Sequence, residues 1–219
     1  MKLTGRRFVS AVLLAALSRA GCSAHSSPQD SIGQEPSRRT AQPASARDAN
    51  VLRYSDTAGS NLLLLVRHAT TQSDENGIVN RLTLHVTHHV ATSDPSQPFR
   101  EAWRHTEVVE CEGLDFDGHF LDEVLRVEDL DGDGFAEILV GFSTFCGGGI
   151  DPRQIKLVLH TRDQDFVLEG ESIVQPPDGP SFGGSFALTP HEDFITPPFR
   201  EALLAGWARV RGGQRGRQP

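Results

Sequence analysis

Alternating apolar and polar residues mark most of the chain as β-structure. The segment RLTLHVTHHV, residues 81–90, places Leu82, Leu84 and Val86 on one face of a strand and Thr83, His85 and Thr87 on the other. Shorter apolar runs follow, namely AEILVGF, IKLVLHT and DFVLEG, each bounded by Gly, Asp or Pro. The pattern therefore predicts a domain built mainly from antiparallel strands.

A long hairpin is expected near the start of this region. The apolar run Leu62–Val66 and the alternating segment Leu82–Val90 are separated by a polar stretch from Thr70 to Asn80. That stretch contains Asn76-Gly77, a dipeptide typical of tight hairpin turns. We therefore expect a loop over residues 70–80 that reverses the chain.

The segment PPFREALLAGWARV, residues 197–210, has the spacing of a helix. Its large apolar residues recur every three or four positions, and Pro198 lies at its start, where a helix tolerates proline. We expect this helix to pack on the sheet with Trp207 in the core. The predicted fold class is mainly β (α+β): an antiparallel sheet domain with a C-terminal packing helix.

The N-terminal residues 1–22 have the pattern of a signal peptide. A basic start precedes the apolar stretch Phe8–Leu17, and small residues follow it. The apolar stretch is much shorter than the about 20 residues that a membrane-spanning helix needs. We therefore predict an exported protein, located in the periplasm, at the outer membrane or outside the cell.

Cys22 suggests a lipid anchor. The tripeptide Ala20-Gly21-Cys22 resembles the lipobox of bacterial lipoproteins, in which the cysteine is acylated and becomes the mature N-terminus; Arg19 stands where that family has an apolar residue. Acylation would tether the protein to a membrane without spanning it. Plain cleavage after Ala20 or Ala24 is the alternative.

Residues 23–50 are predicted to form a disordered tether. They are rich in Ser, Pro, Ala and Gln, with no aromatic residue and a single Ile. Such a segment cannot bury enough apolar surface to offset the entropy lost on ordering. A single β-rich domain is expected over residues 51–212, and a loose basic tail over residues 213–219.

The segment EDLDGDGFAEILV contains the most specific motif of the chain, a calcium-type acidic loop. Gly134 occupies the sixth position, where such a loop turns sharply, and Val140 occupies the twelfth, where an EF-hand would have Glu. The loop instead resembles the Asp-x-Asp-x-Asp-Gly loops of integrin-type propellers. Its candidate calcium ligands are Asp129, Asp131, Asp133, the carbonyl of Phe135, and Glu137.

The charge distribution supports a cation at this loop. The window from Glu107 to Glu137 holds twelve acidic residues and one basic residue, a net charge of −11 against −8 for the whole chain. Such local acidity repels itself unless a cation or a basic partner offsets it, and it does not suit a nucleic-acid partner. A solvated Asp-Gly turn without metal is the alternative. The stretch GLDFDGHFLDE repeats the pattern weakly.

The remaining cysteines form an even pair. If Cys22 is acylated or removed, only Cys111 and Cys146 are left, and an oxidising compartment favours a disulfide between them. A thiol nucleophile and a metal ligand are the alternatives.

The histidines near residue 88 do not have the spacing of a zinc site. On a strand, His85 and His89 share a face about 13 Å apart, while His88 faces the other way. We interpret this segment as a solvated strand face.

Arg67-His68 at the end of an apolar run resembles the opening of the histidine phosphatase family. That chemistry needs a second His, another Arg and helices covering a parallel sheet. His160 ends the run KLVLH, but Thr161 follows it. A phosphatase using Arg67 and His68 is therefore kept as the alternative function.

Several blocks together resemble a family of small exported bacterial proteins, loosely labelled as related to surface polysaccharide biosynthesis. The resemblance spans most of residues 51–207, and its blocks are YSDTAGSNLLLLV, VVECEGLDFD, VEDLDGDGFAEILVGFSTFCGGGIDPRQIKLVLH, FVLEGES and FREALLAGW. It implies export and a surface glycan or envelope protein as partner, but no reaction. The resulting prediction is a non-enzymatic exported envelope (lipo)protein with a calcium-type loop. A purely structural envelope lipoprotein is a further alternative.

Overall fold

The computed structural model describes residues 45–74 and 77–212. The predicted signal peptide, Cys22, most of the tether and the basic tail lie outside the described residues. Within the described residues, no helix is both long enough and apolar enough to cross a membrane.

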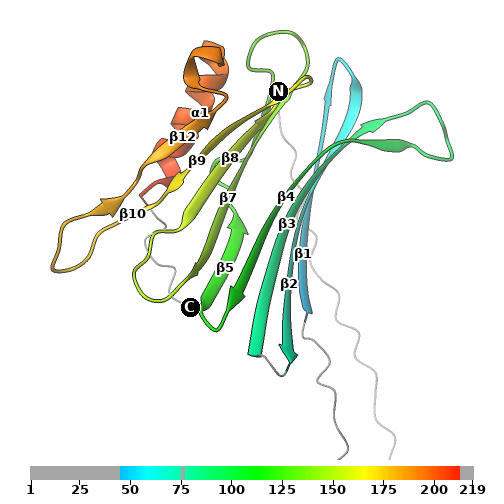
Figure 1. Cartoon of the computed structure of the whole chain (residues 1–219). Helices are drawn as coiled ribbons and strands as arrows, with labels where there is room; N and C mark the ends of the chain where they lie inside the picture. Colours follow the sequence, from blue (N-terminus) through cyan, green and yellow to red (C-terminus); the bar gives the residue numbers. More distant parts are fainter. Residues whose placement is uncertain (1–44, 75–76, 213–219) are drawn as a thin grey trace, which may run out of the picture. The chain divides into compact units, whose positions relative to one another are not determined.

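Four antiparallel strands in chain order form the first sheet, called sheet A here (Figure 1). They are β1 (Ser45–Asp56), β2 (Gly59–Asp74), β3 (Gly77–Ala91) and β4 (Phe99–Glu112). The predicted alternation is confirmed, because Leu82, Leu84 and Val86 are fully buried.

Two predicted boundaries of sheet A are wrong. The strands β2 and β3 stay paired from Thr70↔Arg81 to Asp74↔Gly77, so most of the expected loop over residues 70–80 is strand. The strand β1 begins at Ser45, before the expected domain start at residue 51, and pairs with residues of β2 up to Thr70. In both places the backbone ladder is satisfied by a neighbouring strand, which polar side chains do not prevent.

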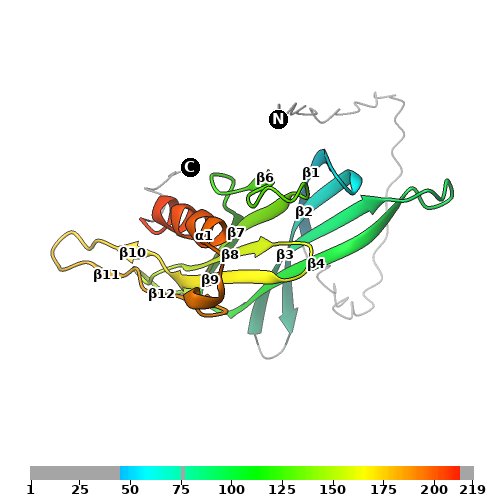
Figure 2. The ribbon, with the colours of Figure 1, turned by 90° about the horizontal axis from the view of Figure 1, so that it is seen from above.

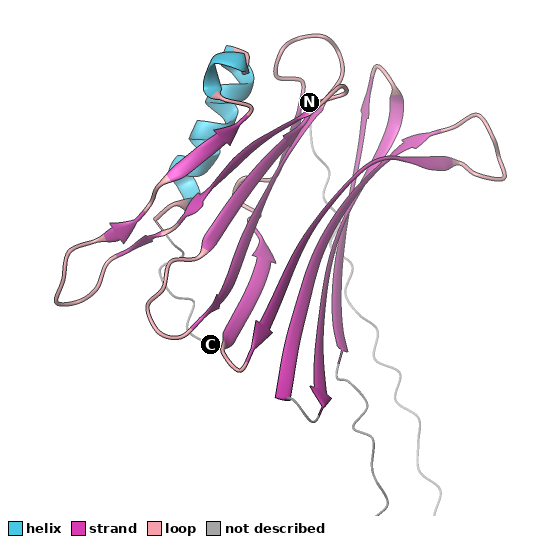
Figure 3. Cartoon of the chain, in the orientation of Figure 1, coloured by secondary structure: helices cyan, strands magenta, loops and turns pink. Residues whose placement is uncertain are grey.

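The second sheet, sheet B, has the strand order β12-β9-β8-β7-β5, with β6 also paired to β7. All its pairs are antiparallel. Its strands are β5 (Asp115–Phe120), β6 (Arg126–Glu128), β7 (Glu137–Gly147), β8 (Gln154–His160), β9 (Asp165–Glu171) and β12 (Phe186–Thr189). A two-stranded ribbon, β10 (Ile173–Val174) with β11 (Phe182–Gly183), a 3-10 turn η1 (Glu192–Phe194) and the helix α1 (Pro197–Val210) complete the chain (Figure 3).

The strand β7 separates two apolar cores. Its residues Ile138, Val140 and Phe142 pack with the inward leucines of sheet A, whereas Leu139 packs with α1 and its neighbours. The domain is thus layered as sheet A, sheet B and helix (Figure 2). The predicted helix is confirmed, and Trp207 is 2 % exposed in the second core. Burial on both faces explains why β7 is a continuous apolar run rather than an alternating one.

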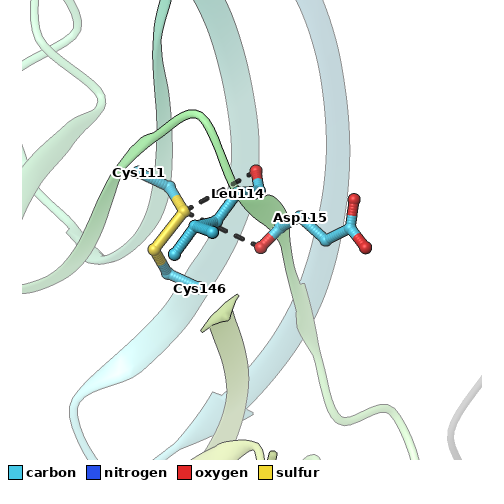
Figure 4. Close-up of a disulfide and its surroundings, with 4 residues drawn as sticks. All are labelled: Cys111, Leu114, Asp115 and Cys146. Atoms are coloured by element: carbon cyan, nitrogen blue, oxygen red, sulfur yellow. Dashed lines mark hydrogen bonds between the residues drawn. A yellow bond between two sulfur atoms is a disulfide. The ribbon is translucent and has the colours of Figure 1, made fainter. Parts of the chain in front are cut away.

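A disulfide connects the two sheets at one end of β7. Cys111, near the end of β4, is bonded to Cys146 in β7, as the cysteine count predicted, with a Cα–Cα distance of 5.7 Å (Figure 4). The Cys111 sulfur also lies 3.8 Å from the Leu114 carbonyl and 3.7 Å from the Asp115 carbonyl. A disulfide sulfur carries no hydrogen, so these are close contacts rather than hydrogen bonds.

The sheets are also connected at the other end of β7. In the turn between β1 and β2, the N–H and the hydroxyl of Thr57 both donate to the Gly134 carbonyl, at 3.0 and 2.7 Å. The N–H of Ala136 in turn donates to Asp56 Oδ2 at 3.2 Å. We call this set the hairpin–loop contact. It joins sheet A to the segment that leads into β7.

Removing the disulfide should destabilise the protein without changing its fold. The bond separates residues 35 positions apart, and a loop of that length gives a crosslink worth about 3–4 kcal/mol in the chain-entropy model. We expect the Cys111→Ser, Cys146→Ser double variant to lose about that much unfolding free energy in urea titrations. Reductant should destabilise the wild type but not the double variant. Alkylatable thiols at both positions in unreduced wild-type protein would contradict the bridge.

Candidate metal centre

The acidic motif forms the loop that joins β6 to β7. Gly132 and Gly134 have φ angles of +82° and +90°, a conformation that side-chain-bearing residues rarely adopt. A Cβ on Gly134 would also lie 2.5 Å from the Thr57 hydroxyl. The glycine at the sixth position therefore permits both the sharp turn and the hairpin–loop contact.

The loop carboxylates accept hydrogen bonds from the backbone of the loop itself. Asp129 accepts from the N–H groups of Gly132 and Gly134, at 2.8 and 3.0 Å. Asp131 accepts from the N–H of Asp133 at 3.1 Å. These bonds orient the side chains, and each carboxylate oxygen still has a lone pair for a ligand.

Three of the predicted ligands converge. One oxygen each from Asp129, Asp131 and Glu137 lies within 4.8 Å of the others. Oxygens that share a calcium ion at 2.3–2.6 Å are separated by at most about 5 Å. The spacing therefore fits a calcium-sized cation.

Glu137 is the buried member of the group, with only 4 % of its surface exposed. Burial raises the pKa of its carboxyl; the N–H of Leu130, 2.8 Å away, opposes this, and the charges of Asp131 and Asp133 add to it. Among the described residues, no Lys or Arg forms an ion pair with the carboxylates of the loop; the Arg162 guanidinium instead lies over the Phe135 ring, 4.5 Å from its centroid. A bound cation would supply the missing positive charge.

The other two predicted ligands are not in this group. Asp133 Oδ1 accepts from the N–H of Phe135 at 2.8 Å, which turns that carboxylate toward the following backbone. The roles of Asp133 and of the Phe135 carbonyl as ligands remain predictions.

The weaker repeat of the motif is not a loop. Asp115, Asp117 and Gly118 lie in β5, which pairs with β7. Asp117 contacts Arg153 at 2.8 Å and His119 at 3.4 Å. The hydrogen bond from His119, together with Arg153 and against the effect of burial, holds the pKa of Asp117 well below its usual range. Asp117 is thus paired with the Arg153 guanidinium and with His119.

Arg67 and His68 lie on opposite faces of sheet A. Arg67 follows the buried Leu63 and Leu65 in the alternation and donates from Nε to the Gly118 carbonyl at 2.8 Å. His68 pairs in register with Thr83, whose strand neighbours Leu82 and Leu84 face inward, so His68 faces outward. The structure therefore does not bring the two residues together as a phosphate site would require.

His88 is not on a solvated face, which corrects part of the sequence interpretation. Its Nε2 lies 2.9 Å from the Tyr54 hydroxyl and 3.0 Å from Asn61 Oδ1. Its Nδ1 is buried without a hydrogen-bond partner in the described part of the chain. Burial, reinforced by the neighbouring His160, lowers the pKa of His88 to about 4. No signal in the sequence pairs these residues, because they come from β1, β2, β3 and β8.

Comparison of the chain with family models, with curated proteins and with solved structures finds no match in any of the three. The assignment of the site therefore rests on its geometry.

His88 should make stability depend on pH. Its pKa is about 4 in the folded protein against 6.5 for an ordinary histidine. As pH falls below 6.5, the unfolded chain binds the proton first, so unfolding free energy decreases toward pH 4. We expect the melting temperature of His88→Gln to depend less on pH than that of the wild type between pH 6.5 and 5. This interval lies above the range where most carboxylates titrate. His191→Gln, at a site 68 % exposed, controls for the loss of one histidine. An unchanged slope in His88→Gln would reject this role.

Proposed function

We propose that the protein is a non-enzymatic, exported cell-envelope protein. Its two packed sheets are stabilised by calcium at the loop between β6 and β7. The observation that carries the proposal is the convergence of Asp129, Asp131 and the buried Glu137 within 4.8 Å of one another. Calcium suits this donor set because it is a hard cation that accepts carboxylate, carbonyl and water oxygens in a flexible shell. The Phe135 carbonyl, Asp133 and water would complete the shell.

The role proposed for the cation is structural. The same loop provides the Gly134 carbonyl and the Ala136 N–H of the hairpin–loop contact. A cation that fixes the loop would therefore also fix the junction between sheet A and β7. In this proposal the loop carboxylates hold the cation rather than act on a substrate.

Export is supported by the disulfide and by the N-terminal pattern. The bond between Cys111 and Cys146 suits an oxidising compartment outside the cytoplasm. The signal peptide and the lipid anchor at Cys22 are proposed from the sequence alone. The family resemblance implies a surface glycan or an envelope protein as the partner. The alternative is a purely structural lipoprotein, which would bind no such partner.

Calcium should stabilise the protein by mass action on the folded state. At a free calcium concentration of 100 times the dissociation constant, the gain is about 2.7 kcal/mol. The melting temperature should therefore rise with calcium and fall with EDTA, and Asp131→Asn should reduce the response strongly. Asp178→Asn, exposed in the turn between β10 and β11, removes the same charge elsewhere and should respond like the wild type. The absence of any shift at millimolar calcium would reject the metal site.

The lipid anchor makes a separate prediction. The full chain, expressed in a bacterial host, should fractionate with membranes, and Cys22→Ser should release it. Mass spectrometry of the mature N-terminus should find an acylated Cys22. A mature chain that starts after Ala20 or Ala24 without acylation would instead show plain cleavage.

A further inference from the structure

A cavity of about 280 Å³ lies between β4 and the strands β7, β8 and β9. Its lining residues are Glu107, Phe142, Thr144, Gln154, Ile155, Lys156 and Glu169. Thr144 follows Glu137 by seven residues in the same strand, which is about 23 Å at 3.3 Å per residue. The cavity is therefore remote from the acidic loop.

Two carboxylates in this cavity flank one ammonium. The Lys156 Nζ lies 2.7 Å from Glu107 Oε1 and 2.6 Å from Glu169 Oε1. His105 Nε2 also contacts Glu107 Oε1, at 2.6 Å. These three contacts are all made to the Oε1 atoms of Glu107 and Glu169. Because an ionised carboxylate has about four lone-pair sites, each Oε2 can still accept a hydrogen bond from a ligand.

Both partially buried partners carry their charges. Burial works against ionisation of Glu107, but its hydrogen bonds and charge interactions with His105 and Lys156 outweigh it, so the pKa of Glu107 lies below its usual value. Burial likewise works against Lys156, but Glu107 and Glu169 outweigh it and raise the pKa of that ammonium. The carboxylates therefore exceed the ammonium by one negative charge.

A bridge that only joined the two sheets would need one carboxylate. Glu107 in β4 already pairs Lys156 with sheet A, and its side chain is 18 % exposed. Glu169 adds a second carboxylate that is 59 % exposed. The surplus charge faces a space bounded by Phe142 and Ile155, with Thr144 and Gln154 as neutral hydrogen-bonding groups.

We propose that this cavity binds a small organic cation that carries a primary ammonium group. The ammonium donates to the Oε2 atoms of Glu107 and Glu169, and the short carbon skeleton lies against Phe142 and Ile155. The volume of about 280 Å³ is near the lower limit of ordinary ligand pockets, about 300–1,000 Å³, which restricts the ligand to a small molecule. The inference does not depend on the metal site.

A matched series of four-carbon probes tests the charge requirement: putrescine, 1,4-butanediol and succinate. We expect putrescine to shift the backbone amide signals of Thr144, Lys156 and Glu169 saturably in NMR titrations of the full chain. Butanediol and succinate should leave them unchanged, and added salt should weaken the putrescine response. Calcium should instead shift Leu130, Gly132 and Gly134, so failure of one site is distinguishable from failure of the other.

Two variants with opposite effects connect the binding to these residues. Glu169→Gln should weaken putrescine binding about threefold to fivefold, as for an exposed ion pair. Lys156→Met should strengthen it, because the competing ammonium is removed. Glu201→Gln, exposed on α1, loses the same charge and should bind like the wild type.

The proposal is overturned if putrescine gives no saturable shift at these amides or if butanediol matches it. It is equally overturned if Glu169→Gln binds as tightly as the wild type. Because Glu169 is 59 % exposed, that variant is expected to fold even if Lys156→Met does not.

Discussion

The burial of β7 between two apolar layers is the constraint on which the rest of the domain depends. Ile138, Val140 and Phe142 hold sheet A on one face, and Leu139 holds α1 on the other. Gly141 is required within this strand, since a Cβ there would lie 2.5 Å from a methyl group of Val124. Because neither face of β7 is free, each element that packs on it is fixed relative to the others.

The two connections between the sheets act at opposite ends of this strand. The disulfide fixes the end at Cys146, and the hairpin–loop contact fixes the end at Glu137. A covalent bond needs no further support in an oxidising compartment. The hairpin–loop contact consists of a few hydrogen bonds to a loop with surplus negative charge, so it is the end at which a cation has most to contribute. The structural role proposed for the cation follows from this position.

Polar side chains of β4, β8 and β9 lie between the two sheets, at the edge of the apolar core. Trp103 Nε1 donates to Asp165 at 3.0 Å, and the Trp103 ring stacks on His160. Lys156 joins Glu107 of β4 to Glu169 of β9. Partly buried charges need partners. Glu107 and Lys156 neutralise each other, and the carboxylate of Glu169 is a negative charge in addition to that pair. The proposal that the cavity binds an organic cation follows from this surplus.

The sequence by itself determined the features that depend on neighbours along the chain. The alternation at Leu82, Leu84 and Val86, the helical spacing before Trp207 and the Asp-Gly loop all follow from short-range periodicity and turn chemistry. The disulfide followed from the even number of cysteines left after Cys22. Only the tertiary structure decided that Glu137 rather than Asp133 joins the acidic group, that His88 meets Tyr54 and Asn61, and that Lys156 lies between two carboxylates. The contacts of His88 and Lys156 join residues of different strands, and no local pattern records which strands pack together. The choice between Glu137 and Asp133 depends on how the loop enters β7, which the spacing of its acidic residues does not specify.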